Sequence, residues 1–147
     1  MGLDMYLYRG DGNDSVAYWR KANAIHRWFV ENVQNGIDEC QRSRVTRDQL
    51  RSLVASCKEV LNVVETVEGR VHNGTMWQDG IRSEIYEPGR VITNPEMARR
   101  LLPTQGGFFF GSTDYDQFYL DDLRSTVEQI EPLLVDGNDD FYYRSSW

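Results

Sequence analysis

The sequence predicts a single α+β domain over residues 1–147, in which three main helices pack on a small antiparallel sheet. Two observations carry this prediction: long segments repeat apolar residues at helical spacing, and both ends of the chain are short, β-prone runs. A glycine-rich stretch over 67–93 separates the second helix from the third. A chain of 147 residues is long enough to bury roughly 68–70% of its unfolded surface in one core.

The first predicted helix covers Ala17–Val33. Its apolar residues recur at intervals of three and four, which is typical of an amphipathic helix, and Asn35-Gly36 is a common C-terminal signal. The second helix has the clearest pattern, because Thr46 and Gln49 match a capping box and apolar spacing then continues to Val64.

The third main helix is predicted to run to about Leu134, with Ser112 or Asp114 as its N-cap and Pro132 in its last turn. A shorter helix precedes it. Asn94 is the expected N-cap of that helix, Pro95 is its first residue, and it ends before Pro103.

The two ends of the chain are predicted to be paired strands. Asp4–Tyr8 is a short β-like run, and the tail Phe141–Trp147 is aromatic and β-prone. We expect the two to pair, because an isolated edge segment needs a partner. Between the helices, Val67–Thr93 scatters β-branched residues among glycines, which predicts a β-rich excursion of short strands and turns.

Charge and composition exclude several classes of protein. The net charge of −7 and the pI near 4.8 argue against binding of duplex nucleic acid through the overall field. No apolar run of about 18 residues predicts a membrane span, and the first residues lack the pattern of a signal peptide. We therefore expect a cytoplasmic protein. Cys57 lies on an apolar helical stripe and is expected to be a buried thiol.

The first candidate site lies along one shoulder of the first predicted helix. Trp19, Asn23 and His26 follow one another at helical spacing, and Arg20 and Arg27 lie just outside them. An indole, an amide, an imidazole and two guanidiniums suit a flat anionic ligand. The alternative is that Trp19 and His26 close the core, although an amide beside them is a poor choice for packing alone.

The second candidate site is the glycine-flanked aromatic run Gly106–Asp114. Backbone N–H groups at a helix N-terminus favour an anion, and hydroxyls nearby could donate to it, but the ending of a phosphate-binding P-loop is missing. The structural alternative is that the acidic residues cap the helix and that Phe108–Phe110 is a buried strand. The candidate residues of this segment are Phe109, Gly111, Ser112, Thr113 and Tyr115.

The third candidate site is the aromatic tail. Tyr142, Tyr143 and Trp147 could form the wall of a pocket in which Arg144 binds a phosphate, although alternating tyrosines are also normal in edge strands. No motif predicts a catalytic residue or a cofactor. The histidines and Cys40 lack the spacing of metal ligands, so no metal is predicted.

Four segments carry a resemblance to a family of small phage and prophage proteins: MGLDMYLY, YWRKANAIHRWFVENVQNGIDEC, LLPTQGGFFFGSTDYDQFYLDDL and FYYRSSW. Members of that family sometimes carry the label phosphoglycerate kinase. That kinase is a two-domain enzyme, and this chain is too short to build two lobes and a hinge. The resemblance implies a phage origin and a protein that acts on a host process by binding.

These observations together predict a small-molecule-binding protein of the nucleotide type. We expect capture without catalysis of a cyclic nucleotide or ADP-ribose-type immune signal in the host cytoplasm, with the base between Trp19 and one of Phe108–Phe110. We expect a homodimer or a higher homo-oligomer, because one small domain offers little surface to enclose a ligand. Two alternatives remain open. One is an enzyme acting on a nucleotide or another phosphorylated metabolite, with His26 as acid or base assisted by Asp114 or Asp116, and the other is an acidic inhibitor of a host protein.

Overall fold

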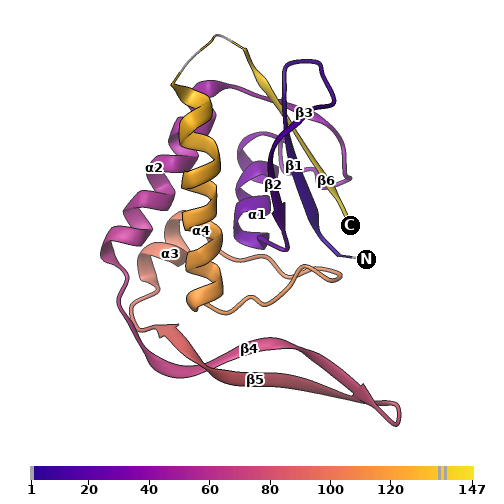
Figure 1. The fold of residues 1–147 in the computed structure, drawn as a ribbon, viewed down its shortest axis with the longest axis vertical. Coiled ribbons are helices and arrows are strands. Elements are labelled where there is room, and N and C mark those ends of the chain that lie inside the picture. Colours follow the sequence, from indigo (N-terminus) through magenta and orange to yellow (C-terminus); the bar gives the residue numbers. More distant parts are fainter. Residues whose placement is uncertain (1, 136, 138) are drawn as a thin grey trace.

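We describe the fold from a computed structural model, which describes residues 2–135, 137 and 139–147 (Figure 1). The chain forms an α+β domain, as the sequence predicts. The elements in chain order are β1 (Asp4–Arg9), β2 (Ser15–Arg20), α1 (Asn23–Asn32), β3 (Ser43–Val45), α2 (Arg47–Val63), β4 (Thr66–Gln78), β5 (Ile81–Ile92), α3 (Glu96–Leu101), α4 (Gln117–Ile130), a 3₁₀ helix (Glu131–Leu134) and β6 (Phe141–Ser146).

The main sheet has four antiparallel strands in the order β2-β1-β6-β3. The predicted pairing of the two chain ends is confirmed, because β1 lies beside β6 with Leu7 opposite Tyr143. Both strands are central in the sheet. The short β3 joins the free edge of β6, where Val45 lies opposite Phe141.

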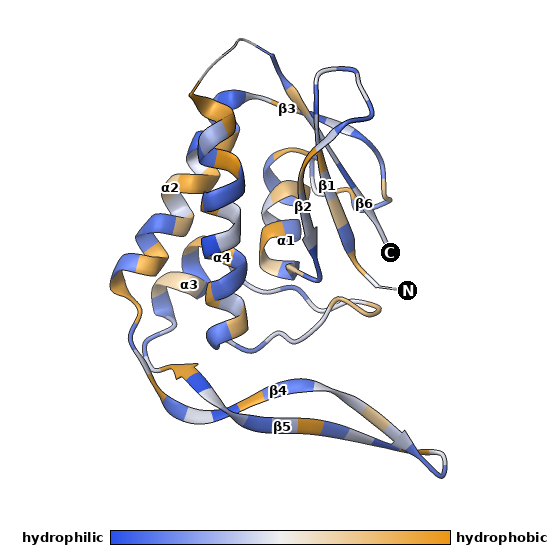
Figure 2. Cartoon of the chain, in the orientation of Figure 1, coloured by the Kyte–Doolittle hydropathy of each residue, from blue (hydrophilic) through white to orange (hydrophobic). Residues whose placement is uncertain are grey.

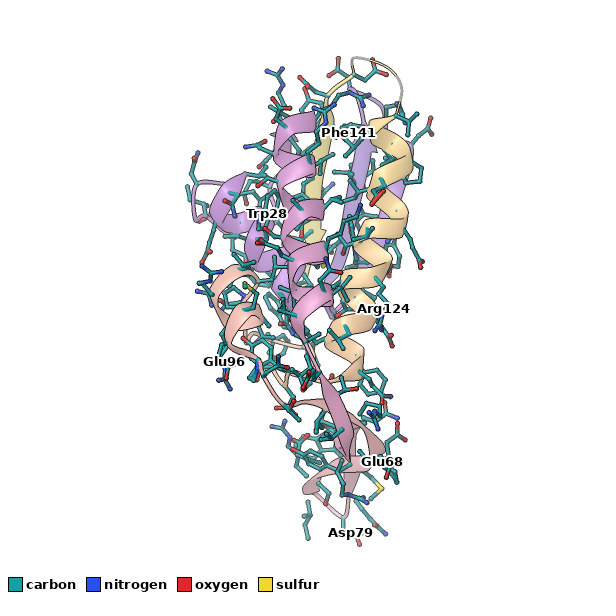
Figure 3. All side chains as sticks on the ribbon, turned by 90° about the vertical axis from the view of Figure 1, so that its left-hand side faces the viewer. Trp28, Glu68, Asp79, Glu96, Arg124 and Phe141 are labelled. Atoms are coloured by element: carbon teal, nitrogen blue, oxygen red, sulfur yellow. The ribbon has the colours of Figure 1, made fainter. Side chains whose placement is uncertain are left out.

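The helices cover one face of this sheet, and the other face is open (Figures 1 and 3). Side chains on successive strand residues point to opposite faces. Met5, Leu7, Phe141 and Tyr143 are therefore buried against the helices, whereas the tyrosines between them face outward.

The N-terminal ends of the helices show which capping predictions were right. The capping box of α2 is confirmed: Gln49 N–H donates to Thr46 Oγ1 (3.1 Å), and Thr46 N–H donates to Gln49 Oε1 (2.9 Å). The predicted N-cap of α4 is wrong. Asp116 caps this helix, because its Oδ1 accepts from the Phe118 and Tyr119 amides.

The predicted N-cap of α3 is also wrong. Pro95 occupies that position, and the Asn94 amide joins the end of α2 to the start of β4. Its Oδ1 accepts from Glu65 N–H (2.7 Å), and its Nδ2 donates to the Val63 carbonyl (2.7 Å). The Asn94 side chain therefore makes tertiary contacts instead of the helix cap that the local sequence predicts.

The first predicted helix is wrong over its first half. Residues 15–20 form β2, and α1 begins only at Asn23. The segment SVAYWR is rich in β-prone residues, and pairing with β1 satisfies its backbone. Lys21 breaks the strand with a φ of 55° and donates its N–H to the Leu3 carbonyl (2.7 Å).

The predicted β-rich excursion is a long two-stranded arm, β4–β5, that projects from the body (Figure 1). Its strands turn at Asp79-Gly80, which have φ values of 52° and 75° as a type I′ hairpin requires. Hydrophobic residues lie along the arm toward its tip, and parts of its ribbon are orange in Figure 2. Trp77 is 68% exposed and Ile81 is 66% exposed.

Within the described ranges, no helix combines the length and apolar character needed to span a bilayer.

Candidate functional site on the open sheet face

The predicted helical row of Trp19, Asn23 and His26 does not exist, because Trp19 lies on β2. Strand alternation turns its ring into the core, where it is 3% exposed and packs against Phe29. Its indole Nε1 donates to Thr126 Oγ1 of α4 (3.0 Å). Trp19 therefore has no free ring face for a ligand, and the interpretation that it closes the core is the one that the structure supports.

Asn23 is buried and holds the aromatic loop against α1. Its Nδ2 donates to the carbonyls of Phe110 (3.0 Å) and Ser112 (2.9 Å), and its Oδ1 accepts from Gln105 N–H (3.0 Å). The amide that seemed a poor choice for packing is thus fully used in bracing the 105–112 loop.

His26 is fully buried in a hydrogen-bonded chain that reaches the C-terminus. A carboxylate can only accept, so Nε2 donates to Asp38 Oδ2 (2.9 Å), and Nδ1 accepts from the Tyr143 hydroxyl (2.6 Å). Asp38 Oδ1 also accepts from the Trp147 indole (3.0 Å). Burial lowers the pKa of His26, and the hydrogen bond to Asp38 opposes that shift. These hydrogen bonds hold the imidazole of His26 in place in its neutral form.

A cavity of about 280 Å³ lies over this network and includes Arg27 and Gln105 in its lining. The side chains of Arg27 and Gln105 already have hydrogen-bond partners within the protein. Arg27 Nε donates to Glu31 Oε1 (2.9 Å), one terminal nitrogen donates to the Thr104 carbonyl (3.3 Å), and Gln105 Nε2 donates to the Gly106 carbonyl (3.0 Å). This cavity has few polar groups left to recognise a ligand.

The Gly106–Asp114 segment forms an irregular loop. Phe108 is 67% exposed and Phe109 is 47% exposed, so the predicted buried strand at Phe108–Phe110 is wrong, although Phe110 itself is buried. The loop does not end at a helix N-terminus, because Asp116 caps α4. Ser112 Oγ accepts from Asp114 N–H, the Thr113 carbonyl accepts from Thr104 Oγ1, and Gly111 lies in the same segment. Tyr115 follows directly after the segment, and its hydroxyl accepts from Thr104 N–H (3.2 Å).

The loop approaches the edge of the sheet at one place. A Cβ added to Gly2 would lie 3.2 Å from a terminal nitrogen of Arg20 and 3.5 Å from the Phe109 carbonyl. Arg20 and the backbone of Phe109 are therefore neighbours, as a shared site would require. Arg144 lies on a central strand and faces the open side of the sheet.

The open face of the sheet carries a cluster of aromatic rings. Tyr6 and Tyr8 lie on β1, Tyr18 on β2 and Tyr142 on β6, and we call these four residues the tyrosine platform. The ring centroids of Tyr6 and Tyr8 are 6.1 Å apart with a 21° angle between planes, and those of Tyr6 and Tyr18 are 5.3 Å apart. Tyr8 lies opposite Tyr142.

Charged groups border the platform on the Tyr6 side. Arg20 donates to Asp4 Oδ1 (2.7 Å), and the Tyr18 hydroxyl donates to the same oxygen (2.5 Å). The bond from Tyr18 and then the bond from Arg20 lower the pKa of Asp4, and the bond to Asp4 raises the pKa of Tyr18. Asp4 and Arg20 therefore form an ion pair that the Tyr18 hydroxyl also stabilises.

Arg144 is the cation that remains available beside the platform. It lies opposite Tyr6 across the β1–β6 pair and is exposed. Its guanidinium has no hydrogen bond or ion pair to any residue that the structure describes. A cavity of about 410 Å³ lies beside it, lined by Tyr6, Tyr8, Arg144, Ser145 and Ser146.

The sequence pattern points to Arg144 and Arg20 but does not reveal the tyrosines of the platform as a group. The available signal was the alternation of tyrosine with core residues in DMYLY, SVAYW and FYY. That pattern shows which side chains share a face of each strand. It does not show that three strands place these faces side by side, or that no helix covers them.

No protein-family model, curated protein or solved structure matches this chain. Among the described residues, no group of three or more His, Cys, Asp and Glu side chains could hold a metal ion. The function is therefore argued from the chemistry of the site.

Proposed function

We propose that the protein binds a small nucleotide-type ligand on the tyrosine platform, with the base stacked at Tyr6 and a phosphate at Arg144. The observation that carries this proposal is the Tyr6–Arg144 pair on adjacent central strands, beside a cavity of about 410 Å³: an aromatic ring and a guanidinium that pairs with none of the described residues. Phosphate is the preferred partner of an arginine fork, and tyrosine rings stack on bases of any sequence.

The platform supports a small ligand better than a long nucleic acid. A polymer is bound mainly through many phosphate contacts, and a chain with a net charge of −7 repels it outside the immediate neighbourhood of the arginines. One exposed arginine beside a few rings suits a ligand with one or two phosphates. The cavity volume lies within the range of about 300–1,000 Å³ that is usual for small-molecule sites.

The resemblance to phage proteins suggests which nucleotides to test first. Adenosine monophosphate is the simplest probe with one base and one phosphate, and cyclic ADP-ribose-type compounds and cyclic dinucleotides represent the host immune signals that a phage protein would sequester. Each is titrated into the protein by calorimetry, and the bound fraction is then released by heat and analysed by mass spectrometry. Intact recovery of a bound nucleotide supports capture, and recovery of a converted product favours the enzyme alternative. Absence of heat with all of these compounds contradicts the proposal.

We further propose that two copies associate through the β4–β5 arm. On its distal half, Met76, Ile81 and Ile85 share one face of the ribbon with Ser83 and are 47%, 66% and 40% exposed. The opposite face carries polar and charged groups that bind one another, because Glu84 binds Thr75, Arg82 and His72, and it also carries the exposed ring of Trp77. Among the described residues of the distal strands, the face of Met76, Ile81 and Ile85 is the one without a charged side chain.

Charge favours a second copy as that partner. The arm over 66–92 has four acidic residues (Glu68, Asp79, Glu84, Glu87) and three basic residues (Arg70, Arg82, Arg90), a net charge of −1 against −7 for the whole chain. The rest of the chain carries a net charge of −6. Electrostatic repulsion between two copies is therefore weakest when they associate through their arms. The uncharged face of Met76, Ile81 and Ile85 can pack against the same face of a second copy when a two-fold axis relates the two copies.

A further inference from the structure

Beyond the platform itself, the side chain of Arg42 covers the half of it that lies away from Arg144. The guanidinium carbon of Arg42 lies 4.8 Å from the ring centroid of Tyr8 and 4.9 Å from that of Tyr142. These two tyrosines are cross-strand partners, so one planar cation stacks on both. It occupies the position where a second base would stack.

The loop after β1 holds Arg42 in this position. Nη2 of Arg42 donates to the carbonyls of Gly12 (2.7 Å) and Gly10 (3.4 Å), and Nη1 donates to Asn13 Oδ1 (3.4 Å). All three acceptors are neutral oxygens of one loop. Arg42 thus bridges this loop to the two rings without using a carboxylate.

We infer that Arg42 is a built-in cap that limits stacking on the platform to a single base of the ligand. The inference rests on the proposed function. Tyr6, with Tyr18 beside it and Arg144 opposite, forms the open half, which accepts one base and its phosphate. Tyr8 and Tyr142 form the capped half. The ligand class is therefore a mononucleotide or another one-base phosphate compound, and a second base in a dinucleotide gains no stacking contact.

The test compares adenosine 5′-monophosphate with the dinucleotide pApA on three proteins. These are the unmodified chain, Arg42→Ala, and the control Arg44→Ala, which removes a neighbouring arginine that pairs with Asp140 at the sheet edge. We expect the unmodified chain to bind both ligands with equal affinity. In Arg42→Ala the affinity for pApA rises about tenfold or more, within the range for one additional stacked base, and the affinity for the monophosphate changes little. Arg44→Ala matches the unmodified chain.

The possible outcomes separate the two proposals. If the monophosphate binds and Arg42→Ala gives no selective gain for pApA, the cap is wrong and the platform stands. If neither ligand binds the unmodified chain or the variant, the platform and the cap are both wrong. Arg42→Lys keeps the charge but loses the planar stack, so its gain for pApA must approach that of Arg42→Ala; retention of the unmodified behaviour overturns the stacking argument. Melting temperatures confirm that each variant is folded.

Discussion

The Tyr143 hydroxyl donates to Nδ1 of His26 across 2.6 Å, and this bond joins the central strand β6 to helix α1 inside the core. Asp38 holds the other ring nitrogen, so both sides of the imidazole are satisfied. The network explains why a histidine and a tyrosine occupy fully buried positions: each polar atom has a partner that replaces water.

Tyr143→Phe tests this network. The change keeps the ring that stacks on Phe29 at a centroid distance of 3.9 Å, but it leaves Nδ1 of His26 without a donor. We expect the free energy of unfolding to fall by about 1–3 kcal/mol in urea titrations. The control Tyr142→Phe removes a hydroxyl from the open face and should change stability by less than about 0.5 kcal/mol. Equal losses in both variants would contradict the assignment.

His26 should also make stability depend on pH. Burial lowers its folded-state pKa below the ordinary value of 6.5. Below pH 6.5 the unfolded chain binds a proton that the folded chain excludes, so this contribution is fully present above pH 6.5 and is lost as the pH falls through the folded-state pKa. Urea unfolding of the unmodified chain and of His26→Gln between pH 7.5 and 5 measures the difference. Parallel curves would rule out the contribution.

Asp122 should act in the opposite direction. Burial on α4, followed by the charge of Asp121, raises its pKa to about 7. A carboxyl with a raised folded-state pKa favours folding at low pH, and that contribution is lost as the pH rises from about 4 to 7. Asp122→Asn should therefore raise stability at pH 8 by on the order of 1–2 kcal/mol and have little effect at pH 4. Thermal melts at the two pH values measure this, and a loss at pH 8 would contradict it.

Trp19→Ala distinguishes a core residue from a ligand-binding one. Removal of this buried indole should cost about 3–5 kcal/mol of unfolding free energy and leave Thr126 without its donor. Where the variant is still folded, its affinity for nucleotide should match that of the unmodified chain. A selective loss of affinity with unchanged stability would restore the predicted base sandwich.

Arg144→Ala and Tyr6→Leu test the platform. A charge-assisted hydrogen bond contributes about 1.5–3 kcal/mol, so Arg144→Ala should weaken binding of adenosine monophosphate by roughly 10–100-fold. Tyr6→Leu keeps apolar bulk but removes the flat ring and should cost a similar factor. The control Arg51→Ala lies on α2, on the covered side of the sheet, and should bind like the unmodified chain in calorimetry.

Cysteine cross-linking tests the arm. In a Cys40→Ser background, Ser83→Cys places a thiol on the apolar face between Ile81 and Ile85, and two copies should form a disulfide dimer under mild oxidation. Arg82→Cys is the matched control, because the neighbouring residue points to the opposite face of the ribbon. Ile81→Glu should abolish the dimer in analytical ultracentrifugation. A chain that stays monomeric at high concentration, or equal cross-linking at both positions, contradicts the proposal.

Local sequence signals predicted the type of several elements. The capping box at Thr46 and the unbroken apolar spacing after it specify α2, whose hydrogen bonds are local, and the β-prone residues at the chain ends indicate β1 and β6, whose stability depends on their pairing with each other. The same reasoning failed at residues 17–22, where the spacing of Tyr18, Ala22 and Ile25 matches a helix. Alternation of Ala17 and Trp19 fits a strand equally well, and only a neighbouring strand with unpaired backbone groups decides between the two.

The sequence by itself determined the α+β composition, the pairing of the two chain ends and the presence of Arg144 beside tyrosines. Only the tertiary structure decided which polar residues are available to a ligand. Asn23 and His26 look free in a sequence because their hydrogen-bond partners lie at positions 105–112 and at Asp38 and Tyr143. Tyr6 and Tyr142 look ordinary because their shared face appears only when β1 and β6 lie side by side. Residues distant along the chain decide whether a polar group is hydrogen-bonded within the protein or exposed to solvent. The local spacing of residues does not reveal those partners.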